Sequence, residues 1–435
     1  MVANRLGPVS GALRTDRYEL TMLQAALRDG TADRRCVFEV FTRRLPEGRR
    51  YGVVAGTERL LTEIAAFRFT SADLEFLASQ GVVDERTCGW LADYRFGGDI
   101  DGYAEGEVYF PGSPVLTLEA GFAEAVVLET LVLSVFNFDS AVAAAAARMV
   151  GAAGSRPVIE MGSRRAHEDA APAAARAAYL AGFAATSNLA AGATYGIPTM
   201  GTSAHSFTLL HDSEAGAFRS QVGALGVGTT LLVDTYDIAA GIRTAIEVAG
   251  TGLGAVRIDS GDLAVLAVQS REQLDSLGAT GTRIVLSGDL DEYALAALAA
   301  APVDAYGVGT SVVTGSGAPS AGFVYKLVEV DGRPVAKRSE HKASRGGRKT
   351  AVRRHRPTGT ATEEVIMSRG QPVAAAGDRA LQVPLVRVGA PVSGRASLDE
   401  SRAHLRRVIG TIPWDGLKLS RGEPAIPTLY EEGRR

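Results

Sequence analysis

Short apolar runs from residue 157 onward in this 435-residue chain end in small polar residues that could handle an anion or a proton. The string VRIDSGDL places Arg257 and Asp259 on one face of a strand, because side chains alternate along a strand, and Ser260 opens the following loop. A carboxylate beside a glycine turn can accept hydrogen bonds from the vicinal hydroxyls of a ribose or from a Mg²⁺-bound water. The string LSGDLDE offers Asp289 in the same layer. These strings predict a polar pocket for a phosphate or a sugar.

Three further strings could bind an anion. In GVGTSVV, Gly307 and Gly309 allow the backbone to approach a phosphate with its amides directed at it. In GSRRAHEDA, Arg164 and Arg165 can hold a carboxylate or phosphate in a bidentate manner. In GTSAHSF, His205 can serve as a general base, a phosphate contact or a phosphoryl acceptor. Each string alone is also typical of an ordinary loop or surface, but six polar tails at strand ends favour a binding pocket.

Parallel βαβ units are the elements that must position these residues. Apolar runs alternate with Ala- and Leu-rich segments of helical period, which predicts an α/β fold with a β/α barrel, complete or incomplete. Active sites of such barrels lie at the carboxyl ends of the strands. The predicted strands and their tails are 157–162, 197–203, 229–237, 255–262, 283–289 and 305–311.

Both ends of the chain predict a second, discontinuous α/β sandwich domain. Residues 15–29 have helical apolar spacing, and 36–45 alternate as a strand does. Residues 323–339 predict a hairpin with an Asp-Gly turn, but the C-terminal strands are too few to fold alone. We therefore expect them to join the N-terminal layer. The expected division is 1–125 for the N-terminal sandwich part, 126–322 for the barrel and 323–435 for the C-terminal part.

The composition is that of an ordinary globular protein, with 46% apolar and 22% charged residues and a net charge of −3. It predicts no attraction to nucleic acid and no membrane span, and the N-terminus lacks a signal-peptide core, so we expect a cytoplasmic protein. Cys36 and Cys88 exclude a four-sulfur zinc site, and no metal-binding side-chain set is predicted. Nucleotide-loop, HExxH and GxSxG motifs are absent from the sequence.

Taken in order, these strings resemble the nicotinate phosphoribosyltransferase family, type II phosphoribosyltransferases of NAD salvage. The resemblance runs from Thr15 to Lys342, and the remaining residues match less clearly. The strings that carry it are TDRYELTM, FEVFTRRLPEGRRYGVVAG, ETLVLSVFNFDSAVAAAAARM, EMGSRRAHEDA, GIPTMGTSAHSF, VDTYD, VRIDSGDL, SGDLDEY, YGVGTSVVTG and FVYKLVEVDGRPVAKRSEHK.

The resemblance implies an ATP-dependent, ligase-type enzyme that makes nicotinate mononucleotide and diphosphate from nicotinate and phosphoribosyl pyrophosphate. It implies His205 as a phosphorylated histidine, Asp259 and Asp289 as further catalytic residues, and Mg²⁺ as the cofactor carried with the phosphorylated substrates. It also implies a homodimer in which Tyr18 completes the neighbour's active site. The substrate-binding residues implied are Tyr18, Met161, Gly162, Arg164, Ser187, Arg257, Ser260, Gly288, Gly307, Gly309 and Thr310.

Other functions stay open on the sequence alone. A related enzyme could use nicotinamide or quinolinate; in the nicotinamide enzymes an Asp stands at the position of Ser187. A non-catalytic, regulatory phosphosugar-binding barrel is a second alternative. An aldolase-type barrel would need a Schiff-base lysine at a strand end, yet the first lysine is Lys326. The basic stretch from Arg338 to Arg354, which includes Lys342 and Lys349, is predicted to help hold substrate phosphates.

Overall fold

The computed structural model describes residues 10–338, 344–368 and 377–432. The chain divides into two compact units, Met1–Ala141 with Ser320–Arg435 and Val142–Pro319. Lys342 of the basic stretch lies outside the described residues.

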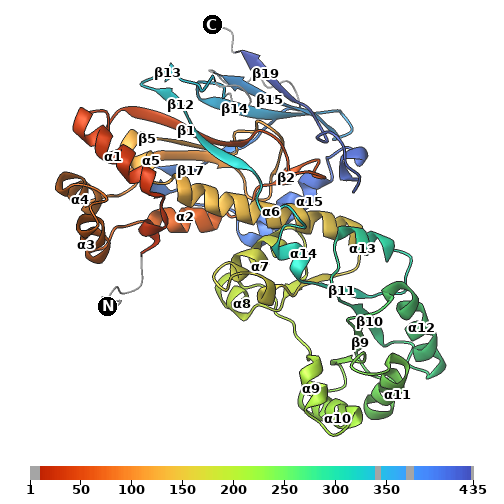
Figure 1. Cartoon of the computed structure of the whole chain (residues 1–435). Helices are drawn as coiled ribbons and strands as arrows, with labels where there is room; N and C mark the ends of the chain where they lie inside the picture. Colours follow the sequence, from red (N-terminus) through yellow and green to blue (C-terminus); the bar gives the residue numbers. More distant parts are fainter. Residues whose placement is uncertain (1–9, 339–343, 369–376, 433–435) are drawn as a thin grey trace. The chain divides into compact units, whose positions relative to one another are not determined.

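The first unit is built on an antiparallel seven-stranded sheet in the order β13-β12-β1-β5-β3-β17-β18 (Figure 1). The sheet therefore interleaves strands from both ends of the chain. Its strands are β1 (Arg35–Thr42), β3 (Asp99–Tyr103), β5 (Leu116–Gly121), β12 (Phe323–Val330), β13 (Arg333–Pro334), β17 (Gln382–Arg387) and β18 (Ala390–Pro391).

Two smaller sheets and a set of helices complete this unit. One sheet has the order β16-β14-β15-β19 and the other pairs β2 with β4. Their bounds are β2 (Gly52–Val53), β4 (Val108–Tyr109), β14 (Lys349–His355), β15 (Ala361–Ser368), β16 (Arg379–Ala380) and β19 (Thr428–Glu432). The helices are η1 (Gly11–Arg14), α1 (Arg17–Asp29), α2 (Thr57–Ala66), α3 (Ser71–Ser79), α4 (Glu85–Ala92), α5 (Phe122–Val126), α15 (Leu398–Ile409) and η3 (Trp414–Leu417).

The hairpin predicted after residue 322 is confirmed. Asp331 and Gly332 both have positive φ, 46° and 73°, as the tight turn of a two-residue hairpin requires. β12 pairs with β1 along its length, and Phe38 stacks on Tyr325 with ring centroids 4.8 Å apart. This pairing buries the apolar face of β1, so the C-terminal hairpin completes the N-terminal core.

The second unit holds a six-stranded parallel sheet in the order β7-β6-β11-β10-β9-β8. Its strands are β6 (Val158–Glu160), β7 (Ala185–Thr186), β8 (Thr230–Leu232), β9 (Ala255–Ile258), β10 (Arg283–Leu286) and β11 (Ala305–Val308). The described strands do not close on themselves, so the predicted β/α barrel is a half-barrel.

Helices connect these strands, and Figure 1 shows α11 and α12 following one another beside β9 and β10. The helices are η2 (Ser163–Arg165), α7 (Ala171–Leu180), α8 (Leu189–Tyr195), α9 (His205–Leu209), α10 (Glu214–Leu225), α11 (Ile238–Ala249), α12 (Leu263–Ser276), α13 (Glu292–Ala297) and α14 (Thr310–Val313).

The strand predicted at 197–203 was wrong. This segment forms only an isolated bridge, in which Thr199 pairs with Thr186. The strand that joins the parallel sheet in this part of the chain is instead the two-residue β7, which precedes the segment. Pro198 has no N–H to donate to a ladder, and Gly201 weakens a strand, so the segment is a poor strand former. His205 consequently begins α9 rather than following a strand.

A long apolar stretch forms α5 followed by α6 (Glu129–Ala153). The sequence predicted no apolar run of membrane-spanning length, but the stretch Phe122–Ala153 is long and apolar enough by length and composition. Its most apolar window is 67% buried, which is typical of the core helix of a soluble protein.

Candidate active site

The carboxyl ends of β9 and β10 are joined by a polar network centred on Arg257. The guanidinium donates from Nε to Ser287 Oγ at 3.0 Å and from Nη1 to Thr202 Oγ1 at 3.0 Å. Nη2 lies 3.4 Å from Oδ1 of Asp259, which also accepts a hydrogen bond from the Ser287 hydroxyl. The prediction that Arg257 and Asp259 share one face of the strand is confirmed, and Asp259 is held by two donors with part of its side chain exposed.

Asp234, two residues after β8, links this network to the neighbouring strand end and is not among the site residues predicted from the sequence. Its Oδ2 accepts the backbone N–H of Asp259 at 2.9 Å and the hydroxyl of Ser260 at 2.8 Å. Its side chain is 1% exposed, and its Oδ1 is buried without a hydrogen-bond partner among the described residues. The string VDTYD at a strand end is the sequence feature that could have pointed to Asp234. Its contact with Asp259 follows only from the pairing of β8 with β9.

His205 faces this buried carboxylate from the first turn of α9. Its Nε2 lies 3.8 Å from Asp234 Oδ1, and its Nδ1 lies 3.1 Å from Thr235 Oγ1. The imidazole is 41% exposed, so one side of the ring faces Asp234 while the ring stays accessible. A carboxylate next to one ring nitrogen favours a proton there and leaves the other nitrogen as the acceptor.

The ends of β6 and β11 form the glycine-lined part of the site. Met161 N–H donates to Val308 O at 2.8 Å, which ties the two strand ends together. A Cβ on Gly307 would lie 2.7 Å from Met161 Sδ, so a side chain there would force the Met161 side chain to move. Buried Glu160 accepts from the N–H of Gly162, and burial raises the pKa of its carboxyl.

Residues after β11 and β7 present further polar groups. Gly309 is the N-cap of α14, whose first residue is Thr310. Ser187 N–H donates to Glu160 O at 2.8 Å, and its side chain is exposed. Asn188 Nδ2 donates to Ser163 Oγ at 2.9 Å, which joins the β7 end to η2.

Arg164 lies on η2 with its side chain exposed. It forms no ion pair or side-chain hydrogen bond with another described residue. The structure thus does not bring Arg164 into the Arg257 network, and its guanidinium stays available to an anionic ligand.

Gly288 and Asp289 form a tight turn after β10. Gly288 has φ +108°, and a Cβ there would lie 2.1 Å from the carbonyl oxygen of Asp259. Asp289 also has a positive φ, 47°, and is exposed. Its carboxylate forms no side-chain hydrogen bond with another described residue, so the turn presents a free carboxylate one residue beyond the backbone contact with Asp259.

Tyr18 lies in the first unit, on α1, and is 45% exposed. Burial and then the negative charge of Glu129 raise the pKa of Tyr18, and the two side chains are hydrogen-bonded. Glu129 also lies 3.7 Å from Lys326 Nζ. The contribution of Tyr18 to a neighbour's site stays a prediction.

Several cations of the basic stretch are occupied by internal ion pairs, so the expectation that the stretch holds phosphates is corrected for these residues. Lys349 Nζ donates to Glu39 at 2.7 Å, and its side chain is 5% exposed. Arg348 pairs with Asp101 and Glu119. These side chains are already neutralised by carboxylates from distant strands, which the sequence pattern did not reveal.

The chain is similar to proteins of one enzyme family along nearly its whole length. Residues 13–137 match the family model described as the nicotinate phosphoribosyltransferase N-terminal domain. The chain is 63% identical over 425 residues to nicotinate phosphoribosyltransferase pncB1 of Mycobacterium tuberculosis, covering 96% of this chain and 94% of that protein. It is 38% identical to nicotinate phosphoribosyltransferase of Bacillus subtilis, covering 74% of this chain and 68% of the relative.

A solved structure supports the same assignment. The crystal structure of human nicotinic acid phosphoribosyltransferase matches with a TM-score of 0.82 and 26% identity, covering 96% of this chain and 97% of that one. The strand-end network, the order of the matched strings and these similarities agree, and the chain therefore belongs to the nicotinate phosphoribosyltransferase family.

Proposed function

We propose that this chain is an enzyme that makes nicotinate mononucleotide and diphosphate from nicotinate and phosphoribosyl pyrophosphate. The observation that carries the proposal is the network of Arg257, Asp259, Ser287 and Asp234 at the carboxyl ends of parallel strands, in a chain of this family. Ligands of parallel α/β sheets bind at this edge.

The reaction needs groups that stabilise opposite charges at the two ends of one breaking bond. The ring nitrogen of nicotinate attacks C1 of the ribose, the C1–O bond breaks, and diphosphate leaves with the electron pair. The sugar then resembles an oxocarbenium ion, which a nearby carboxylate stabilises, while cations and backbone amides stabilise the leaving diphosphate. Asp259 suits the ribose, and Arg257 with the backbone at Gly307 and Gly309 suits the phosphates.

His205 is the residue we assign to the ATP-dependent part of the reaction. The γ-phosphoryl group of ATP passes to an imidazole nitrogen as its bond to the β-phosphate breaks and ADP leaves. Water later hydrolyses the phosphohistidine and releases inorganic phosphate. Asp234 Oδ1 faces Nε2 at 3.8 Å, so a proton on Nε2 would leave Nδ1, beside Thr235, as the phosphoryl acceptor. The exposure of the ring supports access by ATP.

The acidic residues at this edge fit a Mg²⁺ ion that arrives with substrate phosphates. Among the described residues, no group of three or more His, Cys, Asp or Glu side chains is arranged to hold a metal ion. Mg²⁺ usually takes one or two carboxylates, substrate phosphates and water, and Asp259 and Asp289 provide such carboxylates. When bound, the ion supplies charge neutralisation for the leaving diphosphate.

Two features of the proposal concern the substrate and the assembly. Arg164 supplies a cation for the carboxylate of nicotinate, and the neutral hydroxyl of Ser187 can donate to it. The partly exposed ring of Tyr18 supports stacking on the pyridine of a neighbouring subunit, which makes the working enzyme a homodimer.

A product assay tests the proposed reaction. The purified chain is incubated with phosphoribosyl pyrophosphate and Mg²⁺, with nicotinate, nicotinamide or quinolinate, and with or without ATP. We expect nicotinate mononucleotide from nicotinate and a higher rate with ATP. Preferred conversion of nicotinamide or quinolinate would assign the chain to the related reaction, and absence of product from all three would leave the non-catalytic alternative.

A further inference from the structure

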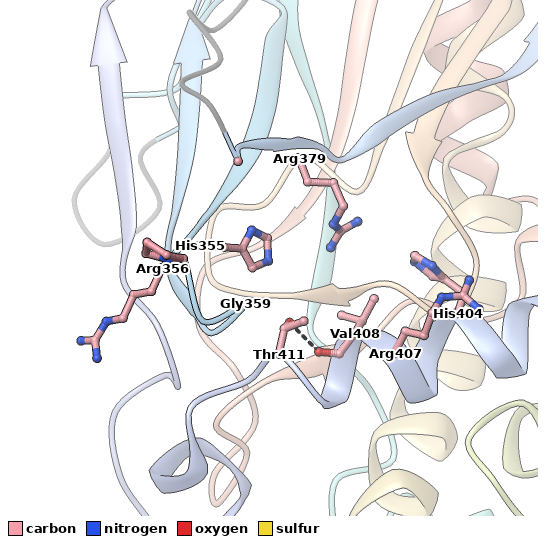
Figure 2. A pocket seen from close by; sticks show the side chains of 10 residues that line it. His355, Arg356, Gly359, Arg379, His404, Arg407, Val408 and Thr411 are labelled. Carbon is pink, nitrogen blue, oxygen red and sulfur yellow. Dashed lines mark hydrogen bonds between the residues drawn. The ribbon is translucent and has the colours of Figure 1, made fainter.

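A cavity of about 720 Å³ in the first unit is lined by guanidinium and imidazole groups (Figure 2). His355 ends β14, Arg379 begins β16, and His404 and Arg407 lie one turn apart on α15. In Figure 2 the side chains of His355 and Arg379 point toward the space above α15. No carboxylate is among the described residues that line the cavity.

The carboxylate behind this wall is already shared among several cations. Glu107 accepts from Arg379 Nη1 at 2.6 Å and lies 2.9 Å from His404 Nε2. It also binds Arg353, whose second partner is Glu364. Glu107 and Glu364 together therefore balance Arg353 and Arg379, and His404 shares Glu107 with them. A positive potential in the cavity thus depends on further basic groups.

Two further basic groups add to that potential. Arg407 is exposed and makes no ion pair or side-chain hydrogen bond with another described residue. Burial is the main cause of a lowered pKa of His355, and the nearby charges of Arg379 and Arg353 lower it further, so the imidazole lies close to both guanidinium groups. A dianion in the cavity would offset the positive charge of these groups.

The cavity also has an apolar side and the size of a small-molecule site. Pro357 and Val408 line it, together with two glycines. Small-molecule pockets commonly measure about 300–1,000 Å³ and combine apolar walls with a few convergent polar groups. The cavity thus has room for an organic group as well as for an anionic one.

We propose that this cavity is a binding site for a phosphate-bearing small molecule. The fork of a guanidinium matches two phosphate oxygens, and Arg379 on β16 and Arg407 on α15 both line the cavity. The imidazole of His355 provides a further N–H donor in its neutral form, which its lowered pKa favours. The site uses residues of the first unit only, so it does not depend on the reaction proposed for the strand ends of the second unit.

Calorimetric titration tests this site in a chain whose strand-end anion site is weakened by Arg257→Gln. The probes are inorganic phosphate, pyrophosphate and ATP without Mg²⁺, at constant ionic strength. In this background we expect pyrophosphate or ATP to bind, and Arg407→Gln with His355→Gln to weaken that binding by roughly tenfold or more. Comparison of ATP with the inorganic probes shows whether a nucleotide or a free phosphate is the better occupant.

Arg356→Gln is the matched control. Arg356 is the exposed arginine directly after His355, and its guanidinium points away from the cavity in Figure 2. It should leave the affinity nearly unchanged. If circular dichroism shows that the double variant does not fold, the single variant Arg407→Gln, at an exposed position, is used for the test. Binding that is insensitive to Arg407→Gln, a loss that is equal in Arg356→Gln, or no binding of any probe at millimolar concentration overturns the proposal.

Discussion

Asp234 has one oxygen engaged and one oxygen free, and this asymmetry explains its place in the proposed mechanism. Oδ2 holds the backbone of Asp259 and the hydroxyl of Ser260, while buried Oδ1 faces the imidazole of His205 at 3.8 Å. A buried acceptor without a partner is costly unless another group uses it. Protonation of His205 Nε2 would satisfy that oxygen, so the phosphoryl-accepting state of the histidine is favoured by its surroundings.

Asp234→Asn tests this role. The amide keeps an oxygen for the N–H of Asp259 but removes the charge that faces His205. We expect the stimulation of product formation by ATP to fall roughly tenfold, about 1.4 kcal/mol, while ATP-independent transfer largely survives. His205→Ala should abolish ATP hydrolysis, and its rate of product formation therefore gives the rate without any stimulation by ATP.

Asp237→Asn is the control, since Asp237 caps α11 from the same string and asparagine caps helices equally well. ATP stimulation that is the same in Asp234→Asn as in the parent chain would remove Asp234 from the mechanism.

Ser187→Asp tests the choice of acid over amide. The Ser187 side chain is exposed beside the β7 end, and a carboxylate there would repel that of nicotinate. Like charges in a desolvated pocket cost several kcal/mol, so we expect kcat/KM for nicotinate to fall by at least about tenfold. Ser187→Asn is the uncharged comparison. Full nicotinate activity in Ser187→Asp would assign the selectivity to other residues.

At the scale of elements, the turn after β10 shapes the site by bringing two strand ends into backbone contact. The backbone of Gly288 lies so close to Asp259 that a Cβ on Gly288 would be 2.1 Å from the Asp259 carbonyl oxygen. The sequence predicted this layer because each apolar run ends in Gly, Ser or Asp. It did not predict β7, which is too short to show a period, or the contact of Asp234 with Asp259, which arises only when β8 and β9 pair.

Gly288→Ala should therefore damage the site through its backbone. The positive φ and the clash with Asp259 both oppose a side chain, and we expect a loss of stability of about 2 kcal/mol with a large loss of activity. Gly281→Ala, in the same βα unit, meets open space and should be nearly neutral. Thermal unfolding and product formation are measured for both. Equal behaviour of the two variants would contradict the close approach.

At the scale of the whole molecule, a buried ion network joins parts of the first unit that are far apart in the sequence. Arg353 is fully buried between Glu107 and Glu364, and Tyr103 donates to Glu364 at 2.6 Å. The hydrophobic period predicts the N-terminal strand at 36–45, but it carries no information on a pair separated by 246 residues. This is why the basic stretch was expected to bind phosphate, whereas Lys349 and Arg353 are buried in ion pairs with carboxylates of the first unit.

The network predicts a specific dependence of stability on pH. Burial alone would raise the pKa of Glu107, but His404, Arg353 and Arg379 outweigh it and hold the pKa well below the ordinary 4.5. The folded state therefore gains stability from this ionised carboxylate above pH 4.5 and loses it progressively as the pH falls below that value.

Glu107→Gln should destabilise the protein by about 3 kcal/mol at neutral pH, because it leaves buried cations unpaired. The difference from the parent chain should shrink as the pH falls below about 4.5, where the unfolded parent binds a proton. Urea unfolding between neutral and acid pH measures both effects. Glu75→Gln, on an exposed face of α3, should change stability by less than about 0.5 kcal/mol. A pH-independent difference would contradict the assignment.

The most direct test of the strand-end site is the steady-state rate of nicotinate mononucleotide formation by Asp259→Asn compared with Asp262→Asn. Both substitutions remove a carboxylate from the string IDSGD, but Asp259 joins the Arg257 network and Asp262 caps α12. We predict a loss of about a hundredfold or more for Asp259→Asn, since each ~1.4 kcal/mol of transition-state stabilisation is worth tenfold, and near-parent activity for Asp262→Asn. Near-parent activity of a folded Asp259→Asn chain would contradict the location of the active site at this edge of the half-barrel.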